Sequence, residues 1–483
     1  MPTTINLGPT TRVEGHLEIE VTVDTVGGKQ QVVAARSAGT MFRGFEIILQ
    51  GRDPRDAVQY TQRICGVCPI SHGMAAALGL ESAFGVVAPD NGRILRNLVL
   101  GANYVQSHIL HFYHLAALDF IDTSAVPAVN MSPWIPRFST PDMVSGSTAG
   151  ALVGHYVQAL AMRRKAHQMG AIVGGHLPCT PTFVAGGSTE VPDATKISNF
   201  RTLLSELRGF IDTVYVPDVL AVAGLFPQYY QLGKGPGNLL AYGVFDLNAA
   251  GGTKLLKRGR YTQGAFGTVD TNQIKEFVKY SWYSSPSGLN PAAGVTTSSA
   301  TKANAYSWVK APRYLNLPHE VGALARMWVN GDYTNGISAL DRHAARALEC
   351  QKVANAMDGW LNELVPGQPT FAGKAVPQTA TGMGLTEAPR GALGHWSQIT
   401  NGVISRYQII TPTAWNASPM DDNNVSGPLE QALVGTPVAD INQPIEVLRV
   451  IHSFDPCLSC AVHMVRPGRD GQSLVIHAAP AAV

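Results

Sequence analysis

The sequence predicts a mainly helical fold of the α+β class, with a large helical bundle as its core and small peripheral β-hairpins or sheets. Long segments with few charges and with apolar residues at helical spacing occupy much of the chain. The clearest alternation of apolar and polar residues, which is typical of strands, is confined to residues 15–36. Two Cys-x-x-Cys pairs stand near opposite ends of the chain and suit one shared metal ion. We therefore expect the N- and C-terminal motifs to converge on a buried metal site.

The first elements along the chain are a hairpin and two long helices. In residues 15–36, Gly27 and Gly28 separate two alternating runs, which predicts a β-hairpin. Residues 93–120 are apolar almost all round and predict a buried helix. Residues 145–172 predict a second long helix of small residues, which is basic near its end, where cations favour the helix dipole.

The rest of the chain combines amphipathic helices with loops. The apolar spacing predicts helices over 196–213 and 338–364. Residues 284–304 and 365–395 are rich in Gly and Pro and predict loops without regular structure. No repeat and no clear linker divides the chain, so we predict a single domain over residues 1–463.

The charge balance excludes some partners. The chain has 36 Lys and Arg against 34 Asp and Glu, a net charge of +2, which gives no electrostatic case for nucleic acid. Charged residues make up only 14% of the chain, against about a quarter usually, so we expect much of the surface to lie against another subunit. We expect no signal peptide, because the first residues contain no basic region and no apolar region, and we expect no spanning helix, because no apolar run reaches about 18 residues. We expect a chain that is soluble by itself or travels with a partner that carries the export signal.

The four cysteines of the two pairs carry the chemistry. Cys65 and Cys68 form the first pair, and Cys457 and Cys460 form the second. Thiolates favour zinc, copper(I), iron–sulfur or nickel–iron chemistry, and a closed structural zinc site is the plainest alternative. The two pairs lie much farther apart than the ~15–20 residues of a zinc ribbon, which speaks against that alternative.

Residues beside both pairs also speak against a purely structural ion. Arg63 precedes the first pair and Asp455 precedes the second. Each pair is followed by a histidine, His72 or His463. Such flanking groups orient and tune a metal ion more than a structural role requires.

These motifs resemble the two signatures of the large subunit of nickel–iron hydrogenases. The signatures here are Arg63-Ile64-Cys65-Gly66-Val67-Cys68 followed by His72, and Asp455-Pro456-Cys457-Leu458-Ser459-Cys460 followed by His463. Four further segments match the family, in its order along the chain: Arg12-Val13-Glu14-Gly15-His16, Phe42-Arg43-Gly44-Phe45-Glu46, His111-Phe112-Tyr113-His114-Leu115 and Glu387-Ala388-Pro389-Arg390-Gly391-Ala392-Leu393-Gly394-His395. The resemblance therefore covers essentially the whole chain.

The resemblance implies a Ni-Fe(CN)2CO centre held by the cysteines. Nickel would bind all four, and iron would share Cys68 and Cys460, which leaves Cys65 and Cys457 on nickel alone. Cys457 would take the proton released from dihydrogen, and Glu14 would carry it outward. A partly buried carboxyl with a raised pKa suits such a relay. Taken alone, Glu14 would be interpreted as a surface glutamate at the start of a strand.

Other matched residues would complete the centre. Arg390 would lie over the metals, where its guanidinium can donate to cyanide, and a surface ion pair is the alternative interpretation. Pro389 would shape the same pocket, and His72 would donate to a bridging sulfur. Asp455 would hold Arg390 or cap the turn before Cys457.

The resemblance also implies a second ion, magnesium or ferrous iron, near the C-terminal end. Glu46, His463 and the backbone carbonyl of Ile409 would bind it. Magnesium prefers oxygen ligands, so a histidine nitrogen leaves the identity of the ion open. Taken alone, Glu46 would be interpreted as a residue on a helix surface.

Three histidines on one apolar helix, His108, His111 and His114, admit two interpretations. We expect satisfied core histidines rather than a second metal site. Ser107 stands where many family members carry an acidic residue, which puts a carboxylate contribution from this helix in doubt.

The implied activity is that of the catalytic subunit of a hydrogenase, an oxidoreductase that reversibly splits H2 heterolytically, here in the direction of uptake. Electrons would leave through an iron–sulfur small subunit in an obligate heterodimer, and a dimer of heterodimers is also compatible. Cys179 and Cys350 are too few to hold iron–sulfur clusters and are expected to be inert core thiols. The alternatives are a hydrogen-sensing regulatory subunit and a structural four-cysteine zinc protein of a redox complex.

Residues 464–483 follow the second motif. The resemblance implies that a maturation protease cuts after His463 once nickel-insertion factors have loaded the site, so that 464–483 is a removable extension. An ordinary terminus is the alternative. Sensor hydrogenases generally lack the extension, which favours an enzyme. The implied location is membrane-associated or periplasmic, through the export signal of the small subunit, and the cytoplasm is the alternative.

Overall fold

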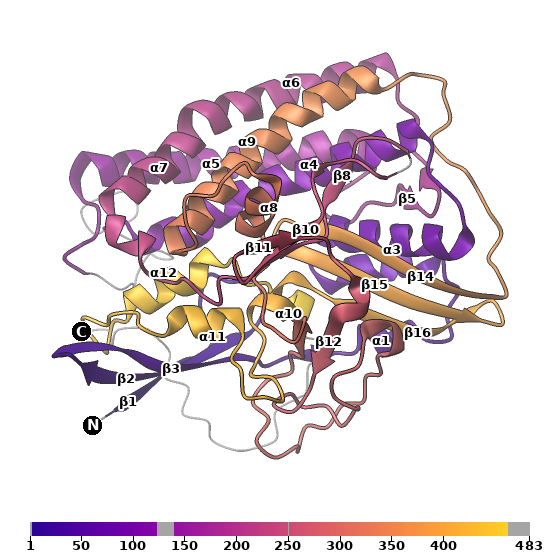
Figure 1. Ribbon diagram of the computed structural model, residues 1–483. Coiled ribbons are helices and arrows are strands. Elements are labelled where there is room, and N and C mark those ends of the chain that lie inside the picture. The colour runs from indigo at the N-terminus through magenta and orange to yellow at the C-terminus, as the bar shows by residue number, and fades with distance from the viewer. Residues whose placement is uncertain (1, 123–139, 250, 462–483) are drawn as a thin grey trace, which may run out of the picture.

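The computed structural model describes residues 2–122, 140–249 and 251–461. Long helices lie side by side along one flank, and the first sheet and the C-terminal helices lie on the other (Figure 1). The bounds of the α-helices are α1 (Phe45–Ile48), α2 (Asp56–Thr61), α3 (Pro69–Phe84), α4 (Asp90–Leu110), α5 (Gly146–Gly174), α6 (Ala194–Phe210), α7 (Val216–Leu225), α8 (Ala323–Asn330), α9 (Ala339–Glu363), α10 (Pro412–Asn416), α11 (Pro428–Leu433), α12 (Ile445–Ser453) and α13 (Leu458–Ala461).

Shorter turns and several small sheets complete the description. The π-helical turns are η2 (His111–Ala116) and η5 (Ile211–Tyr215), and the 3-10 turns are η1 (Gln62–Ile64), η3 (Ala117–Asp119), η6 (Pro227–Tyr230), η7 (Thr271–Gln273) and η8 (Pro291–Ala293). The strands are β1 (Thr3–Leu7), β2 (Leu17–Val26), β3 (Lys29–Gly39), β4 (Phe42–Arg43), β5 (Phe183–Val184), β6 (Gly187–Ser188), β7 (Leu239–Ala241), β8 (Val244–Asp246), β9 (Lys254–Leu256), β10 (Gly259–Thr262), β11 (Ala265–Gly267), β12 (Ile274–Phe277), β13 (Ala311–Tyr314), β14 (Thr379–Ala388), β15 (Gly391–Thr400) and β16 (Val403–Ile410).

The predicted elements are largely present. The hairpin predicted over 15–36 is β2 and β3, which pair antiparallel and continue into β1. The helices predicted over 145–172 and 338–364 are α5 and α9. The helix predicted over 93–120 is α4 followed by η2 and η3, and the helix predicted over 196–213 is α6 followed by η5. The loop predicted over 284–304 contains only the short turn η8.

The loop predicted over 365–395 is wrong in its second half. Residues from Thr379 onward form β14 and β15, which pair with β16 in a three-stranded antiparallel sheet. The glycines that suggested a loop allow this sheet to lie directly on α3, because a Cβ on Gly384 would come within 1.9 Å of the carbonyl oxygen of Ala75. This sheet packs on a long helix, so the mainly helical class describes the fold only loosely, and helices and small sheets share it.

Two hydrophobic cores flank the region where the cysteines meet. The larger core joins helices α3 to α7 and α9, and the smaller core joins the first sheet with α10, α11 and α12. A third, small cluster contains Ala388 and the four motif cysteines: Cys65, Cys68, Cys457 and Cys460. Because α3 belongs to the larger core and α12 to the smaller one, the cysteine pairs reach the cluster from different cores.

Candidate metal centre

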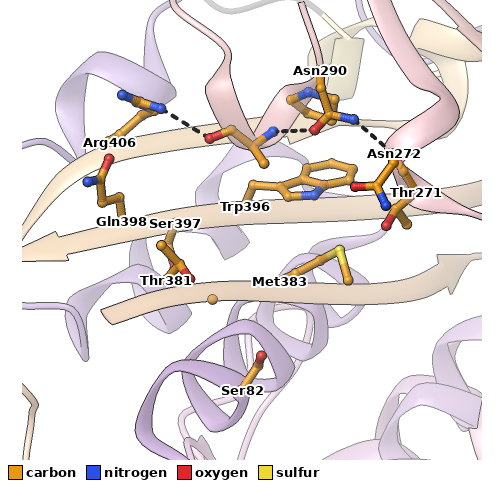
Figure 2. A pocket seen from close by; sticks show the side chains of 13 residues that line it. Ser82, Thr271, Asn272, Asn290, Thr381, Met383, Trp396, Ser397, Gln398 and Arg406 are labelled. Atoms are coloured by element: carbon orange, nitrogen blue, oxygen red, sulfur yellow. Dashed lines mark hydrogen bonds between the residues drawn. The ribbon is translucent and has the colours of Figure 1, made fainter. Parts of the chain in front are cut away.

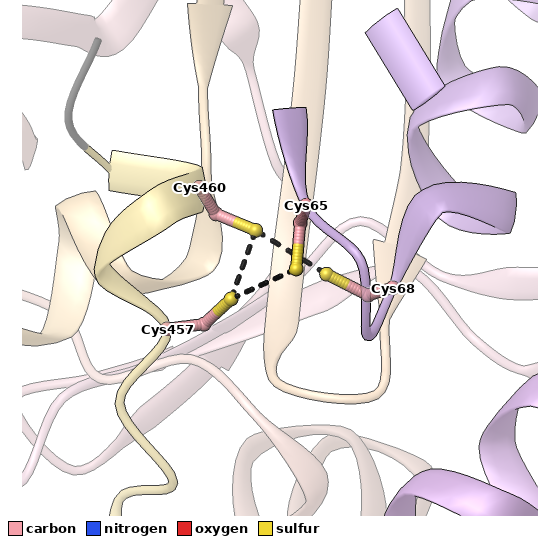
Figure 3. Close-up of side chains that lie close together, drawn as sticks. All are labelled: Cys65, Cys68, Cys457 and Cys460. Atoms are coloured by element: carbon pink, nitrogen blue, oxygen red, sulfur yellow. Dashed lines mark hydrogen bonds between the residues drawn. The ribbon is translucent and has the colours of Figure 1, made fainter. Parts of the chain in front are cut away.

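The sulfurs of Cys65, Cys68, Cys457 and Cys460 meet at one buried point (Figure 3). All four lie within 4.8 Å of one another. The Sγ–Sγ distance is 3.3 Å for Cys65 and Cys457, 3.2 Å for Cys68 and Cys460, and 3.0 Å for Cys457 and Cys460. Each cysteine is at most 2% exposed. Within the described residues, no other group of three or more His, Cys, Asp or Glu side chains converges in this way.

The first pair is fixed by the start of a helix. Cys68 is the N-cap of α3, and Pro69 occupies the first helical turn, where its missing N–H costs nothing. The carbonyl oxygen of Val67, between the two cysteines, accepts hydrogen bonds from Asn103 at 3.0 Å and from Gln106 at 3.1 Å, both on α4. The loop is therefore tied to the helical core.

The second pair is fixed by the N-terminal segment. Glu14 forms a parallel bridge with Cys457, in which Glu14 N donates to Pro456 O at 3.2 Å and Leu458 N donates to Glu14 O at 2.7 Å. Gly15 has φ of 81°, and a Cβ there would lie 2.5 Å from Ser459 N, so only glycine permits this approach. The backbone of Glu14 can therefore pair with Cys457 because the next residue, Gly15, has no side chain.

Arg43 joins the two cysteine segments. Its Nη2 donates to the carbonyl oxygen of Ile64, beside the first pair, and to that of Ser459, within the second pair, at 2.5 Å. The sequence pointed instead to Arg63 as a group that supports the site, and that interpretation is wrong. The Arg63 side chain is exposed, and its carbonyl oxygen accepts a bond from Arg43 at 3.3 Å.

Glu14 is placed directly against a cysteine. Its Oε2 lies 3.1 Å from Cys457 Sγ and accepts a hydrogen bond from Ser459 N at 3.0 Å. Burial and the nearby Cys65 sulfur raise the pKa of Glu14, and hydrogen bonds from Cys457 and Ser459 partly oppose this. The carboxyl group is thus the acidic side chain in contact with the sulfur cluster.

Arg390 lies at the turn between β14 and β15 and is 2% exposed. Its Nε is 3.0 Å from Asp455 Oδ1, an ion pair between side chains that are each 1% exposed. Its Nη1 and Nη2 are buried and donate to no hydrogen-bond acceptor among the described residues. Burial alone would lower the pKa of Arg390, but Asp455 and the sulfurs of Cys457, Cys68 and Cys65 raise it well above its usual value.

His72 lies in a short row of polar rings. Its Nδ1 is 3.2 Å from Nε2 of His395, whose Nδ1 is 2.9 Å from the hydroxyl of Tyr407. Donation from His72 to a bridging sulfur stays a prediction.

Glu46 occupies a second buried polar site. It is 3% exposed, accepts a hydrogen bond from Ile409 N at 2.9 Å and another from the hydroxyl of Thr296, and lies 3.7 Å from Nζ of Lys310. Glu46 and Ile409, predicted to bind the same ion, are therefore neighbours. His463, the third predicted ligand, lies outside the described residues, as does the extension 464–483.

The three histidines of the helix predicted over 93–120 join no metal-binding group among the described residues. His108 Nε2 is 2.8 Å from Glu349, and His111 Nε2 is 2.6 Å from the carbonyl oxygen of His452. His114 packs against Tyr156, with ring centroids 4.5 Å apart. His108 and His111 are therefore core histidines, but Nδ1 of each has no hydrogen-bond partner among the described residues, so they are satisfied only in part.

Sequence reasoning missed a second buried arginine close to the centre. Arg326 on α8 is fully buried, with its guanidinium between Glu349 and the residues that precede Arg390. Charged residues inside otherwise apolar helices are the signal that could have identified it, because a buried charge requires partners.

A cavity of about 310 Å³ is lined by residues of β14, β15 and β16, by Ser82 on α3 and by residues between 271 and 292 (Figure 2). Trp396 on β15 stands below Asn290, and Arg406 donates to the carbonyl oxygen of Ala292 at 3.1 Å. The lining of this cavity contains no Cys, His, Asp or Glu, so the cavity offers none of the usual metal-ligating side chains.

Comparison with known proteins gives extensive matches. The model of the nickel-dependent hydrogenase family matches residues 43–133, 126–336 and 329–463. The periplasmic [NiFeSe] hydrogenase large subunit of Desulfomicrobium baculatum is 42% identical over 496 residues, which cover 95% of each chain. The uptake hydrogenase large subunit of Rhizobium leguminosarum bv. viciae is 34% identical over 580 residues, which cover 97% of this chain and 96% of that protein.

A solved structure matches over almost the whole chain. The Ni-Fe-Se hydrogenase from D. vulgaris Hildenborough in the reduced state superposes with a TM-score of 0.91 at 44% identity, covering 96% of this chain and 100% of that one. Two of these relatives are selenium enzymes by name, whereas all four sulfurs of the site described here belong to cysteines.

Proposed function

The chain belongs to the nickel-dependent hydrogenase family as the large, catalytic subunit of a hydrogenase, and we propose that its four clustered cysteines hold the nickel and iron at which dihydrogen is split. The reaction yields protons and electrons and runs in the direction of uptake. The observation that carries the proposal is the approach of the four buried sulfurs to within 4.8 Å of one another.

The donor set fits this centre. Soft thiolates suit nickel and iron. Burial raises the pKa of the Cys457 thiol and that of the Cys460 thiol well above the usual value for cysteine. A metal that binds these sulfurs therefore has to displace their protons. We assign Cys65 and Cys457 to nickel alone and Cys68 and Cys460 to both metals. When bound, a Ni-Fe(CN)2CO centre supplies the site at which dihydrogen is polarised and gives up electrons.

The proton then passes through two side chains of this subunit. Cys457 accepts it and transfers it to Glu14, because their 3.1 Å separation is within transfer range. The hydrogen bond from Ser459 N keeps the carboxyl group aimed at the sulfur. Glu14 thus leads the proton out of the cluster.

Arg390 places a positive charge beside the sulfurs. Its two terminal nitrogens are available to donate to the diatomic ligands of iron, since its Nε faces Asp455. Pro389 stiffens the turn that carries Arg390, and His72 donates to a bridging sulfur.

Glu46, the carbonyl oxygen of Ile409 and the ring of His463 would hold a magnesium or ferrous ion. The buried carboxylate of Glu46 supports this assignment. Lys310 Nζ lies 3.7 Å from Glu46 Oε2, so a bound cation would have to share that carboxylate with an ammonium group.

The partner is the small subunit of the hydrogenase, with which the chain forms a heterodimer. We assign the iron–sulfur clusters to that partner, and export to the periplasm or the membrane surface to its signal. No helix among the described residues is long and apolar enough to cross a membrane. Residues 1–463 form one functional domain, and a maturation protease removes 464–483 after nickel-insertion factors have loaded the site.

Metal analysis and a hydrogen assay of the purified heterodimer test the proposal. We expect one nickel per large subunit, stoichiometric iron, and rapid hydrogen-dependent reduction of a viologen dye. Four-cysteine zinc without nickel would refute it. Nickel with only slow dye reduction would favour the hydrogen-sensing alternative.

A further inference from the structure

We infer that Arg326 is a positioning residue for Arg390: it fixes the backbone turn that carries Arg390 beside the cysteine cluster. The inference rests on the role proposed above for Arg390. Arg326 lies on α8, outside both cysteine motifs, and its side chain is 0% exposed.

The guanidinium of Arg326 uses all five of its N–H donors. Two bind Glu349, from Nε to Oε1 and from Nη2 to Oε2, each at 2.6 Å. Two bind consecutive carbonyl oxygens of the turn, those of Ala388 at 2.9 Å and Pro389 at 2.8 Å. The fifth binds Glu387 Oε2 at 2.9 Å. The three residues that precede Arg390 are therefore all held by one side chain.

Arg326 is itself anchored to the helical core. Glu349 on α9 pairs with it in a bidentate fashion, and His108 on α4 lies 2.8 Å from Glu349 Oε2 on the opposite side. Tyr104, one turn before His108, donates its hydroxyl to the carbonyl oxygen of Glu387 at 3.0 Å. Helices α4, α8 and α9 thus define where the turn lies.

Arg390 depends on this support because its own side chain has one charged partner, Asp455. Its terminal nitrogens have no hydrogen-bond acceptor in the described chain. The next residue, Gly391, has φ of 136°, and a Cβ there would lie 2.5 Å from Cγ2 of Val321, just before α8. The direction of the Arg390 side chain therefore depends on the ion pair with Asp455 and on the backbone turn, which Arg326 holds.

Lysine cannot replace Arg326. It keeps the positive charge but has three donors on one nitrogen, so it cannot bridge Glu349 and both carbonyl oxygens in the planar arrangement. Arg326→Lys thus removes the geometry while it retains the charge. Arg313→Lys is the matched control, because Arg313 is also 0% exposed and bonded to a buried carboxylate, Asp421.

The test measures three quantities on the purified heterodimer: nickel content, hydrogen-dependent dye reduction, and the infrared bands of the diatomic ligands on iron. We expect Arg326→Lys to retain nickel, to lose at least tenfold in activity, and to shift the infrared bands in the same sense as Arg390→Lys. Arg313→Lys should retain nickel, with bands unchanged and activity within twofold of the parent enzyme.

A double variant separates positioning from a general structural effect. If Arg326 acts through Arg390, adding Arg326→Lys to Arg390→Lys should lower activity less than twofold further. A further tenfold loss, or unshifted bands in Arg326→Lys, would overturn the inference and leave the role of Arg390 intact. Unchanged activity and bands in Arg390→Lys would instead refute the proposed role of Arg390.

Should Arg326→Lys fail to load nickel, Glu349→Gln replaces it, because glutamine keeps the size of the anchor and removes its charge. A loaded Glu349→Gln enzyme with shifted bands supports the inference. Absence of nickel from both variants, with Arg313→Lys fully loaded, would overturn it in favour of a role in assembly.

Discussion

Glu14 Oε2 lies 3.1 Å from the sulfur of Cys457, although 443 residues separate them in the chain. A backbone bridge between the same two residues holds this contact, because it places their Cα atoms side by side. The segment between β1 and β2 is therefore joined directly to the last motif, with the acidic group against the sulfur.

Replacing Glu14 by glutamine should stop proton transfer while preserving the site. Glutamine keeps the shape and can still accept the hydrogen bond from Ser459 N, so we expect normal nickel content and normal binding of the small subunit. Hydrogen-dependent dye reduction should fall by roughly a hundredfold or more, as expected when a general acid–base group is lost. Glu20→Gln, at a half-exposed carboxylate on β2, is the control. Unchanged turnover in Glu14→Gln would refute the relay.

Replacing Cys460 by serine should block maturation. The hydroxyl is a poor ligand for nickel, and Cys460 Sγ lies within 3.2 Å of two other sulfurs, so its loss opens the cluster. We expect the chain to keep residues 464–483 and to lack nickel, as measured by intact mass and metal analysis. Cys350→Ser, at a buried cysteine outside the cluster, should be cut and loaded normally. A shortened, nickel-loaded Cys460→Ser chain would show that Cys460 is not an essential ligand.

Replacing Glu46 by glutamine should empty the second ion site. The variant keeps the size of the side chain but removes the charge that attracts a divalent cation, so metal analysis should detect about one magnesium or iron fewer per heterodimer. Glu430→Gln removes an equally buried carboxylate elsewhere and should leave the metal content unchanged. An unaltered ion content in Glu46→Gln would show that Glu46 does not bind the second ion.

Glu430 should make the stability of the chain fall as pH rises. Burial raises the pKa of Glu430 from 4.5 to about 7, while hydrogen bonds from Ser37, Tyr306 and Gly427 oppose this. Between these two values the folded state binds more protons than the unfolded state, so the free energy of unfolding decreases as pH rises from about 4.5 to 7, by on the order of 3 kcal/mol. The stabilisation is complete below 4.5 and lost above 7.

Thermal unfolding at pH 5 and pH 8 measures this effect. Glu430→Gln cannot ionise, so its melting temperature should differ less between the two pH values than that of the parent chain. Glu20→Gln, half-exposed on β2, should show the parental difference. An identical pH dependence in Glu430→Gln would mean that Glu430 is ionised throughout.

The sequence was sufficient to predict that the four motif cysteines meet at one buried point, but not which groups position them. Cysteine pairs with fixed spacing indicate a metal site, and Glu14 could be identified because it belongs to a short motif. Arg326 has no motif of its own, because its partners Glu349 and Pro389 come from distant segments that only the fold brings together. Arg63 misled for the opposite reason, since a residue next to a ligand in sequence can still face solvent.

The strands after residue 379 were missed for a related reason. Glycine ordinarily weakens a strand, so Gly382 and Gly384 predict a loop. Here they are required by contact between backbones, because a Cβ on Gly382 would lie 2.2 Å from the carbonyl oxygen of Gly79 on α3. Prediction from neighbouring residues alone cannot account for contact with a helix that is distant in the sequence.

Replacing Gly384 by alanine tests this packing directly. The new methyl group would lie 1.9 Å from the carbonyl oxygen of Ala75 and 2.5 Å from Gly79 N, and neither backbone atom can turn away as a side chain can. We expect the free energy of unfolding to fall by roughly 3 kcal/mol, as in overpacked cores. Because α3 begins directly after Cys68, displacement of α3 should also lower nickel content.

Gly209→Ala is the matched control, since a Cβ on this residue of α6 meets no atom within 4 Å and should stabilise the helix by up to about 1 kcal/mol. Denaturant unfolding measures the change in stability, and metal analysis measures the nickel content. A Gly384→Ala chain with the stability of the parent chain would show that α3 and β14 are not in close backbone contact.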